Sequence, residues 1–300
     1  GVDAVLAEWP EVSAGRPVER AFVHVDMPAA LRAELLALNT PGANELHRAA
    51  MAANALARLY AEAVEGVLRE VGVSRTQVRA LGAHGQTVRH RPHEFDGLGY
   101  TVQLLNGALL AELSGIDVVC DLRARDVAAG GQGAPLVPAF HAEVFGRADQ
   151  DVAVLNIGGI ANLTLLPARG EVRGFDCGPG NLLMDLWAQR QQCGDFDADG
   201  SLASSGRLHQ DLLQRLLEEP FFGRTPPKST GRDHFNADWL DARLAGSDSA
   251  TPADVMATLA ELTAVAACEA MARHAPATRR LLVCGGGAHN GHLMRRLEAL

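Results

Sequence analysis

Several features are scarce or missing in this 300-residue sequence. Its five cysteines are scattered and never form a CxxC pair, which argues against a disulfide framework or a zinc site and favours a reducing compartment. The histidines show no HxxEH-like spacing, so no metal site built from protein ligands is expected. Gly-x-Ser-x-Gly and Walker A patterns are also absent, which disfavours hydrolases of that type and P-loop kinases.

Positive charge is in short supply as well. Lys and Arg number 27 against 36 Asp and Glu, so the formal net charge is −9. Broad nucleic-acid binding, which needs phosphate neutralisation by Lys and Arg, is therefore not expected. No apolar run approaches the length that spans a bilayer, and no membrane association is expected either. The chain starts without an initiator Met or a signal peptide, and we expect a cytoplasmic protein.

Strand-like apolar runs, helical patterns and glycine loops alternate along the chain, which indicates an α/β fold. Two apolar runs, 152–157 and 160–166, flank a Gly158-Gly159 turn and predict a β-hairpin. The 3.6-residue period of apolar side chains predicts the main helices, near residues 28–38, 45–72, 103–114, 182–192, 209–219, 238–244 and 253–274. Loops are predicted at residues 122–138, 176–181 and 192–205.

The most informative segment is the run from Asp176 to Asn181, an Asp followed by a Gly-Pro-Gly turn that opens a predicted helix. The turn would hold the carboxylate in place, and the free N–H groups of a helix N-terminus attract phosphate. A held carboxylate near phosphate can take a proton from a hydroxyl or a water. The alternative is that Asp176 simply caps the turn or the helix, as Asp commonly does.

Two more glycine segments would let backbone approach a ligand. The N–H groups around Gly158-Gly159 can donate to phosphate, although Gly-Gly is also an ordinary hairpin turn. Residues 285–287 are three glycines between a strand and a helix. They would leave room for a flat ring or a nucleotide, and a tight strand-to-helix connection is the alternative.

Three polar segments are candidates for binding a sugar or its charged groups. His84-Gly85-Gln86-Thr87 follows a predicted strand and offers several donors and acceptors, although a lone His is often structural. The arginines of 121–126 can clamp a carboxylate, or they belong to a solvated ion-pair loop. Residues 228–232, Lys-Ser-Thr-Gly-Arg, can hold phosphate or form an exposed basic loop.

The order of these motifs along the whole chain resembles the anhydro-N-acetylmuramic acid kinase family. The motifs are HGQTV, DLRARDVAAGGQGAPLVPAFH, LNIGGIANLT, DCGPGN, PKSTGRDHFN, ATLAELTA and VCGGGAHN. This resemblance implies the sugar kinase, Hsp70 and actin superfamily, whose members have two RNase H-like α/β domains (the actin-like ATPase fold) with a nucleotide cleft between them. We place these domains at residues 1–145 and 146–300, and expect the chain to be truncated at both ends.

The resemblance also implies a reaction and its cofactors. Using ATP and water, the family opens the 1,6-anhydro bridge of the muramic sugar and phosphorylates O6, in peptidoglycan recycling and amino-sugar catabolism. Asp176 aligns with the general base, Mg²⁺ would neutralise phosphate charge, and a homodimer is expected. ATP is assigned to Gly1, Val2, Asp3, Gly158, Gly159, Asn162, Gly285, Gly286, Gly287 and Asn290. The sugar is assigned to His84, Gln86, Thr87, Arg123, Asp126, Gly178 and Asn181, with Arg123 or Arg125 facing its lactyl carboxylate.

The sequence departs from the family at two positions, since Cys177 stands where Thr is expected and Arg89 where an aromatic residue is expected. Two other functions stay open. A non-catalytic ATP- or sugar-binding module has no need for the acid at Asp176, which this chain keeps. A kinase for another small sugar or acid is disfavoured by the HGQT and GGQGAP segments, through the resemblance alone.

Overall fold

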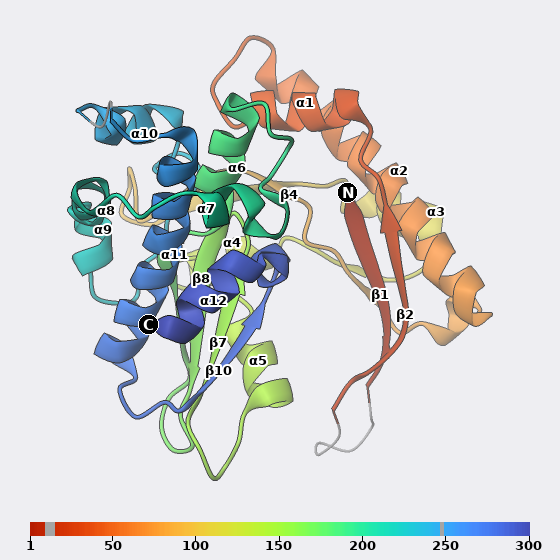
Figure 1. Ribbon diagram of the computed structural model, residues 1–300. Coiled ribbons are helices and arrows are strands. Elements are labelled where there is room, and N and C mark those ends of the chain that lie inside the picture. The colour runs from red at the N-terminus through yellow and green to blue at the C-terminus, as the bar shows by residue number, and fades with distance from the viewer. Residues whose placement is uncertain (10–15, 247–248) are drawn as a thin grey trace. The chain divides into compact units, whose positions relative to one another are not determined.

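The computed structural model describes residues 1–9, 16–246 and 249–300 (Figure 1). The chain divides into two compact units, Gly1–Gly133 (unit 1) and Ala134–Leu300 (unit 2). Each unit combines strands with helices, which confirms the expected α/β class. Helix α5 (Pro138–Phe145) packs on the unit 2 sheet, where His141 Nδ1 lies 2.8 Å from Thr164 Oγ1. The division into compact units falls before α5, and the domain boundary predicted after residue 145 stays a prediction.

The described residues of unit 1 form three two-stranded sheets. The pairs are β1 (Val2–Glu8) with β2 (Val18–Val25) and β4 (Gln86–Pro92) with β5 (Gly99–Leu104), both antiparallel, and β3 (Leu81–Gly82) parallel to β6 (Val118–Val119). The helices are α1 (Ala29–Ala37), α2 (Glu45–Val71), η1 (Arg75–Gln77), α3 (Gly107–Ser114) and α4 (Leu122–Ala128). Helix α2 buries one apolar face and ends at Gly72, whose φ of 72° suits a glycine helix cap.

Two expectations for unit 1 were wrong in detail. The helix expected from residue 103 starts only at Gly107, because residues 103–104 complete β5 and the Asn106 side chain caps the helix by accepting from Leu109 N at 2.9 Å. The stretch predicted as a loop after Asp121 contains α4. In the first case pairing with β4 kept residues 103–104 in a strand where a helix was expected, and in the second a helix formed where polar and glycine residues suggested a loop.

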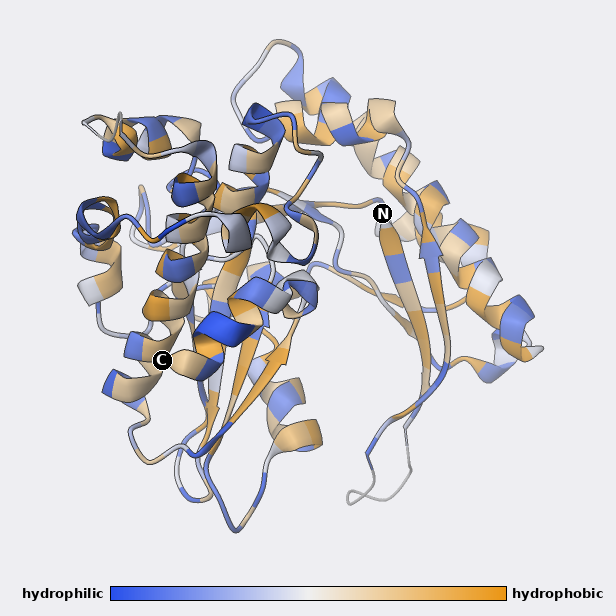
Figure 2. Ribbon diagram, viewed as in Figure 1, coloured by the Kyte–Doolittle hydropathy of each residue, from blue (hydrophilic) through white to orange (hydrophobic). Residues whose placement is uncertain are grey.

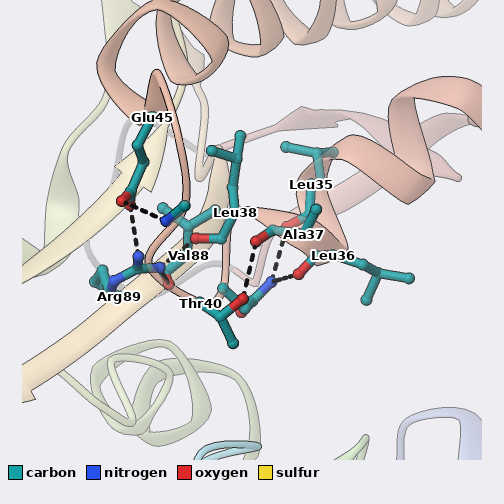
Figure 3. Close-up of polar contacts among 10 residues, drawn as sticks. Leu35, Leu36, Ala37, Leu38, Thr40, Glu45, Val88 and Arg89 are labelled. Carbon is teal, nitrogen blue, oxygen red and sulfur yellow. Dashed lines mark hydrogen bonds and ion pairs between the residues drawn. The ribbon is translucent and has the colours of Figure 1, made fainter.

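Arg89 links β4 to the segment between α1 and α2 (Figure 3). Its guanidinium donates to Glu45 Oε1 at 2.5 Å, to Val88 O at 2.9 Å and to Leu38 O. The arginine that replaces an expected aromatic residue thus satisfies a carbonyl at the end of α1 and a carboxylate at the start of α2. It has a structural role that an apolar ring could not fill.

Unit 2 is built on one four-stranded sheet in the order β10-β7-β8-β9. Strands β7 (Val152–Ile157), β8 (Ile160–Leu166) and β9 (Arg173–Pro179) form an antiparallel meander, and β10 (Arg280–Cys284) runs parallel to β7. The strands are mostly hydrophobic, as their orange colour in Figure 2 shows, and β7 and β8 are almost completely buried. The hairpin predicted around Gly158-Gly159 is confirmed.

Helices surround this sheet. They are α6 (Leu182–Arg190), η2 (Ala198–Gly200), α7 (Ser201–Ser205), α8 (Gln210–Leu217), α9 (Pro220–Gly223), α10 (Ala237–Leu244), α11 (Pro252–His274), η3 (Gly286–His289) and α12 (Gly291–Ala299). The segment 192–205, predicted to be a loop, instead contains η2 and α7, and the Asp197 carboxylate accepts from Leu202 N and Ala203 N of α7 at 2.8 and 3.0 Å. Asp197 and Ala203 are both buried.

Helix α11 corrects the expectation that no apolar run is long enough to cross a membrane. By length and composition it is the one described helix that passes, but 72% of its apolar window is buried in the structure. It packs against β8, β9 and four helices of unit 2. A core helix passes the same test, and burial of this extent is what a core helix shows.

Candidate active site

Asp176 lies within strand β9 rather than in the loop predicted for residues 176–181. The register of β8 and β9 shifts beside it: Ala161 pairs with Gly178 and Asn162 with Asp176, which leaves Cys177 as an extra residue in a β-bulge. Bulges bend a strand and re-aim its side chains, and they are frequent near active sites. Asp176 is only 5% exposed, so its carboxylate is both buried and directed by the sheet.

A neighbouring segment holds Asp176 at two points. Its backbone N–H donates to Lys228 O at 3.1 Å, and its Oδ2 accepts from Thr230 N at 2.9 Å. Lys228 is itself buried, and its ammonium donates to Phe221 O and Phe222 O at 3.1 and 3.3 Å. Burial lowers the pKa of Lys228, and these bonds compensate the buried charge. The 228–232 segment therefore serves, in part, as the support of the carboxylate.

Three glycine segments meet a few residues beyond Asp176. Gly180 N and Asn181 N donate to Gly159 O and Gly158 O at 2.9 and 2.8 Å. A Cβ on Gly180 would collide with Gly158 O, so only glycine permits this approach. We call this meeting point, formed by residues 158–159, 180–181 and 285–287, the glycine junction.

The triple-glycine loop joins the same junction. A Cβ on Gly285 would lie 2.6 Å from Asn156 Oδ1 and 2.7 Å from Ile157 O, and a Cβ on Gly287 would collide with the Ile157 side chain. The Asn181 amide links the parts, since its Nδ2 donates to Ile157 O at 3.3 Å. The predicted Gly285 and Gly287 thus approach Asn156 and Ile157, more than 120 positions earlier in the sequence, at the end of β7.

A helix behind the junction fixes its backbone. Thr263, at the buried centre of α11, donates through Oγ1 at 3.1 Å to both Pro179 O and Gly180 O. The ATLAELTA motif therefore contributes a hydroxyl that supports the Gly-Pro-Gly turn. Periodicity alone indicates only a core position for this threonine.

Two other residues predicted to bind ATP, Asn162 and Asn290, differ in whether their side-chain oxygen has a hydrogen-bond partner. Among the described residues, Asn162 Oδ1 is a buried oxygen without a hydrogen-bond partner, on the strand position opposite Asp176. Such an atom in a native fold calls for an explanation, and a bound group is one. Asn290, by contrast, is the N-cap of α12 and its Oδ1 accepts from Leu293 N at 3.0 Å, so this oxygen is already used.

Cys177, the departure from the family motif beside the predicted base, points into the core. It is 1% exposed and belongs to the main hydrophobic cluster of unit 2. Burial, with a smaller contribution from the Asp176 charge, raises the pKa of its thiol well above the usual range. The thiol stays protonated at neutral pH and acts as a small apolar side chain.

Asp185 and Arg232 add a charged pair near the junction that motif reading missed. Asp185 lies in the first turn of α6, and burial raises its pKa to about 6, while Arg232 lowers it and Asp195 raises it. The Nη2 atom of Arg232 lies 3.6 Å from the point where a Cβ on Gly159 would sit. A half-buried acid with a raised pKa beside an arginine is a signal of a functional site, and only the fold reveals it.

Replacing Asp185 with asparagine is expected to stabilise the fold at pH 8. The carboxyl has a higher pKa in the folded chain (about 6) than its ordinary 3.8, so its favourable contribution is complete below pH 3.8 and lost as the pH rises through 6. The variant avoids this loss and should gain about 1–2 kcal/mol at pH 8, after allowance for solvent screening. Urea unfolding at pH 8 and pH 4 measures it, and a gain that is equal at both pH values would contradict the assignment.

In unit 1, four of the five residues predicted to bind the sugar take part in hydrogen bonds, three of them in one cluster around Gly133. Arg123 Nε donates to His84 Nε2 at 2.8 Å, and Arg123 Nη1 donates to Gly133 O at 2.6 Å. Asp126 Oδ2 accepts from Gly133 N at 2.7 Å, which brings it into the same cluster. Thr87 lies in β4, where its Oγ1 accepts from Gln103 Nε2 at 3.2 Å. Gln86, the fifth, also lies in β4.

The protonation of His84 follows from its partners. Arginine only donates, so Nε2 must accept and Nδ1 must carry the hydrogen that it donates to Gly85 O at 2.8 Å. Burial lowers the pKa of His84, and the Arg123 charge lowers it further. His84 is therefore neutral near pH 7. Arg125, the other arginine considered for a carboxylate, is exposed on α4.

The three N-terminal residues predicted to bind ATP, Gly1, Val2 and Asp3, lie at or just before the start of β1. Val2 is buried, while Asp3 is exposed and its Oδ1 lies 2.6 Å from His24 Nδ1. This bond and that of Asp26 raise the pKa of His24. A Cβ on Gly1 would collide with the His24 ring.

An α/β fold in which glycine turns meet beside a held carboxylate is typical of enzymes that transfer phosphate. The sequence model of the family described as anhydro-N-acetylmuramic acid kinase matches residues 1–300. The chain belongs to this kinase family.

Individual relatives agree with the match. The anhydro-N-acetylmuramic acid kinase of Variovorax paradoxus (strain S110) is 59% identical over 304 residues, which cover 100% of this chain and 80% of the relative. That of Bordetella pertussis is 56% identical over 300 residues, covering 99% of this chain and 77% of the relative. A solved activator of 2-hydroxyisocaproyl-CoA dehydratase from Clostridium difficile with bound ADPNP covers 79% of this chain and 70% of its own at 13% identity, with a TM-score of 0.42. That likeness carries no argument about this chain.

Proposed function

We propose that this kinase uses ATP and water to open the 1,6-anhydro bridge of anhydro-N-acetylmuramic acid and to phosphorylate O6. The products are N-acetylmuramic acid 6-phosphate and ADP. The observation that carries the proposal is the buried Asp176 carboxylate, set in a β-bulge and bonded to Thr230 N, at the edge of the glycine junction. Burying a carboxylate costs free energy, so a buried acid held in place by hydrogen bonds is typical of a functional site.

Asp176 is the general base in this reaction. Its carboxylate takes a proton from water as the water oxygen attacks the anomeric carbon, and the bond from that carbon to the bridge oxygen breaks. The freed O6 then attacks the γ-phosphorus of ATP, and the bond to the β-γ bridging oxygen breaks to release ADP. The Thr230 N–H donates to Oδ2 and so fixes the orientation of the carboxylate.

ATP binds against the glycine junction, where bare backbone at residues 158–159 and 285–287 lets phosphate and nucleoside approach closely. Arg232 lies beside this turn and would pair with phosphate. Asn162 is a further proposed contact in unit 2, and the contacts predicted for Gly1, Val2 and Asp3 of unit 1 stay predictions. Asn290 acts indirectly, as the cap that fixes the helix after the glycines.

The donors present fit Mg²⁺, the metal that phosphoryl transfer requires. No cluster of three or more His, Cys, Asp or Glu side chains suited to a metal occurs in the described part of the chain. Mg²⁺, however, commonly uses one or two protein oxygens and fills its shell with water and phosphate. The unpartnered Asn162 Oδ1, opposite Asp176, is such an oxygen. When bound, the ion would neutralise charge on the phosphates.

Sugar contacts are proposed for the five unit 1 residues and, separately, for Gly178 and Asn181 of unit 2. Neutral His84, held by Arg123, offers no free Nε2, so Arg123 and the amide of Gln86 are the better donors for a lactyl carboxylate and for hydroxyls. Asn181 is committed to the junction through Ile157 O and contributes mainly by fixing the turn. Gly178 adopts a φ of 147° beside the Phe222 ring, where a side chain would collide.

The finer fold assignment, the homodimer and the cytoplasmic location stay predictions. For unit 2, the meander β7-β8-β9 with β10 parallel to β7 supports an RNase H-like domain. The same domain type is proposed for unit 1. One alternative is a binding module without catalysis, which does not explain the support built around Asp176. The other is a kinase for another small sugar or acid, which would use the same carboxylate and differs only in its substrate.

Product analysis tests the proposal. The purified full-length kinase, anhydro-N-acetylmuramic acid, ATP and Mg²⁺ are incubated in ¹⁸O-labelled water, and the sugar product is examined by mass spectrometry. We expect a 6-phosphosugar that carries one ¹⁸O at the anomeric position and an equal amount of ADP. A phosphosugar without ¹⁸O would exclude the coupled hydrolysis, and turnover of hexoses or acetate in place of the anhydro sugar would favour the alternative kinase.

A further inference from the structure

Behind Asp176 lies a line of polar side chains that the proposed mechanism does not use. Thr230, whose N–H bonds the Asp176 carboxylate, has its Oγ1 3.2 Å from His234 Nδ1. His234 Nε2 lies 3.1 Å from Glu219 Oε1. The line therefore runs from the carboxylate through Thr230 and His234 to Glu219, a residue that is 8% exposed.

Glu219 is a firm end point for this line. Its other oxygen, Oε2, accepts from Trp239 Nε1 at 2.8 Å and from Arg243 Nη2 at 3.1 Å. Burial alone would raise the pKa of Glu219, but the Trp239 bond and the neighbouring His234 hold it below the usual range. The glutamate is thus ionised at neutral pH and only accepts, so His234 Nε2 must carry a hydrogen. In the neutral imidazole, Nδ1 then accepts from the Thr230 hydroxyl.

The imidazole is also fixed by aromatic rings. His234 stacks on Phe235 with ring centroids 4.5 Å apart at 20°, and it meets the edge of Phe221 at 6.0 Å. Two hydrogen bonds and two ring contacts leave the ring little freedom. A group so constrained, one step removed from the predicted base, suits a positioning role.

We infer that His234, anchored by Glu219, is a positioning residue that sets the Thr230 N–H against Asp176 and so holds the carboxylate in its reactive orientation. The expected effect on turnover rests on the proposed function, whereas the contacts from Thr230 through His234 to Glu219 do not depend on it. Loss of the imidazole removes the hydrogen-bond partner of the Thr230 hydroxyl and lets the 228–232 segment shift. A shift of about 1 Å in a catalytic group can lower turnover by about a hundredfold.

The test compares four single variants of the full-length kinase. His234→Phe keeps a ring that can stack on Phe235 but removes both hydrogen bonds, and Thr230→Val keeps the N–H but removes the hydroxyl. Each should lower kcat by about ten- to a hundredfold, with KM for ATP and sugar changed less than about threefold. Thr230→Ser, which restores the hydroxyl, should recover most of the kcat lost in Thr230→Val.

Trp239→Phe is the matched control. It removes one donor to Glu219 Oε2 and perturbs the same buried cluster, but leaves the Oε1 contact with His234. We expect its kcat to stay within about threefold of wild type. If His234→Phe lowers kcat no more than Trp239→Phe does, or if Thr230→Ser is as slow as Thr230→Val, the positioning role is excluded.

A second measurement separates this inference from the proposed reaction. In ¹⁵N-labelled protein, the amide proton of Thr230 should resonate downfield because it bonds a carboxylate, and the signal should move upfield in His234→Phe. An unmoved signal would overturn the inference even in an active enzyme. If the signal moves in His234→Phe but the wild-type enzyme does not convert the anhydro sugar, the contact is established and the proposed substrate is refuted.

Discussion

The Asp176→Asn variant is expected to lose 10²–10⁴-fold in kcat while keeping its affinity for ATP within about threefold. An amide cannot take the proton from the attacking water, so the coupled opening of the sugar stops. Its Oδ1 can still accept from Thr230 N, as the carboxylate does at 2.9 Å, so the fold around the bulge should persist. Steady-state kinetics with anhydro-N-acetylmuramic acid measure kcat, and a nucleotide titration measures the affinity for ATP.

A surface variant controls for the loss of a negative charge. Asp241, on α10, pairs with Arg190 and its side chain is 56% exposed. Asp241→Asn removes the same charge by the same chemistry and should turn over at the wild-type rate. Equal activity of Asp176→Asn and wild type would remove Asp176 from the mechanism, and a joint loss of turnover and thermal stability would reduce it to a structural acid.

Gly285→Ala is expected to be the most damaging change in the glycine junction, lowering stability by about 2–5 kcal/mol. Gly285 adopts a φ of 83°, and its added Cβ would lie 2.6 Å from Asn156 Oδ1 and 2.7 Å from Ile157 O. Both the strained backbone and the collision push the loop away from the end of β7. We expect KM for ATP to rise at least tenfold, because the nucleotide surface moves with the loop.

The adjacent glycine is a matched control. A Cβ on Gly286 would meet only Asn181 Nδ2, at 3.6 Å, an ordinary contact distance. The free energy of unfolding of Gly286→Ala, measured in urea, should therefore stay within about 1 kcal/mol of wild type, whatever the change in its affinity for ATP. If the two variants unfold at the same denaturant concentration, the close approach of Gly285 to Ile157 is not a constraint on the fold.

Elements whose residues interact locally could be predicted well. The helices α2 (Glu45–Val71) and α11 (Pro252–His274) begin and end within one or two residues of their expected positions. The hairpin around Gly158-Gly159 also formed as predicted. In each case the period of apolar residues and the caps or turn agree with one another, so no distant contact is needed to choose the conformation.

Elements that depend on pairing partners were predicted poorly. Gly178 and Pro179 indicate a turn, yet they continue β9 because β8 lies alongside and pairs with it across the bulge. The β4-β5 hairpin, which contains Gln86 and Thr87, was not predicted, because it too depends on strand pairing. Backbone hydrogen bonds to a distant strand outweighed the local preference of these residues.

For the candidate site, too, the sequence and the tertiary structure each determined a different part. The sequence by itself determined the chemical groups, since the order of the motifs identifies the family and marks Asp176 and the glycines as candidates. Only the tertiary structure decided which groups meet: the bulge that directs Asp176, the Thr263 hydroxyl under the turn, and the contacts from Thr230 to Glu219. Residue type and spacing act over a few positions, whereas hydrogen bonds between distant segments depend on how sheet and helices pack.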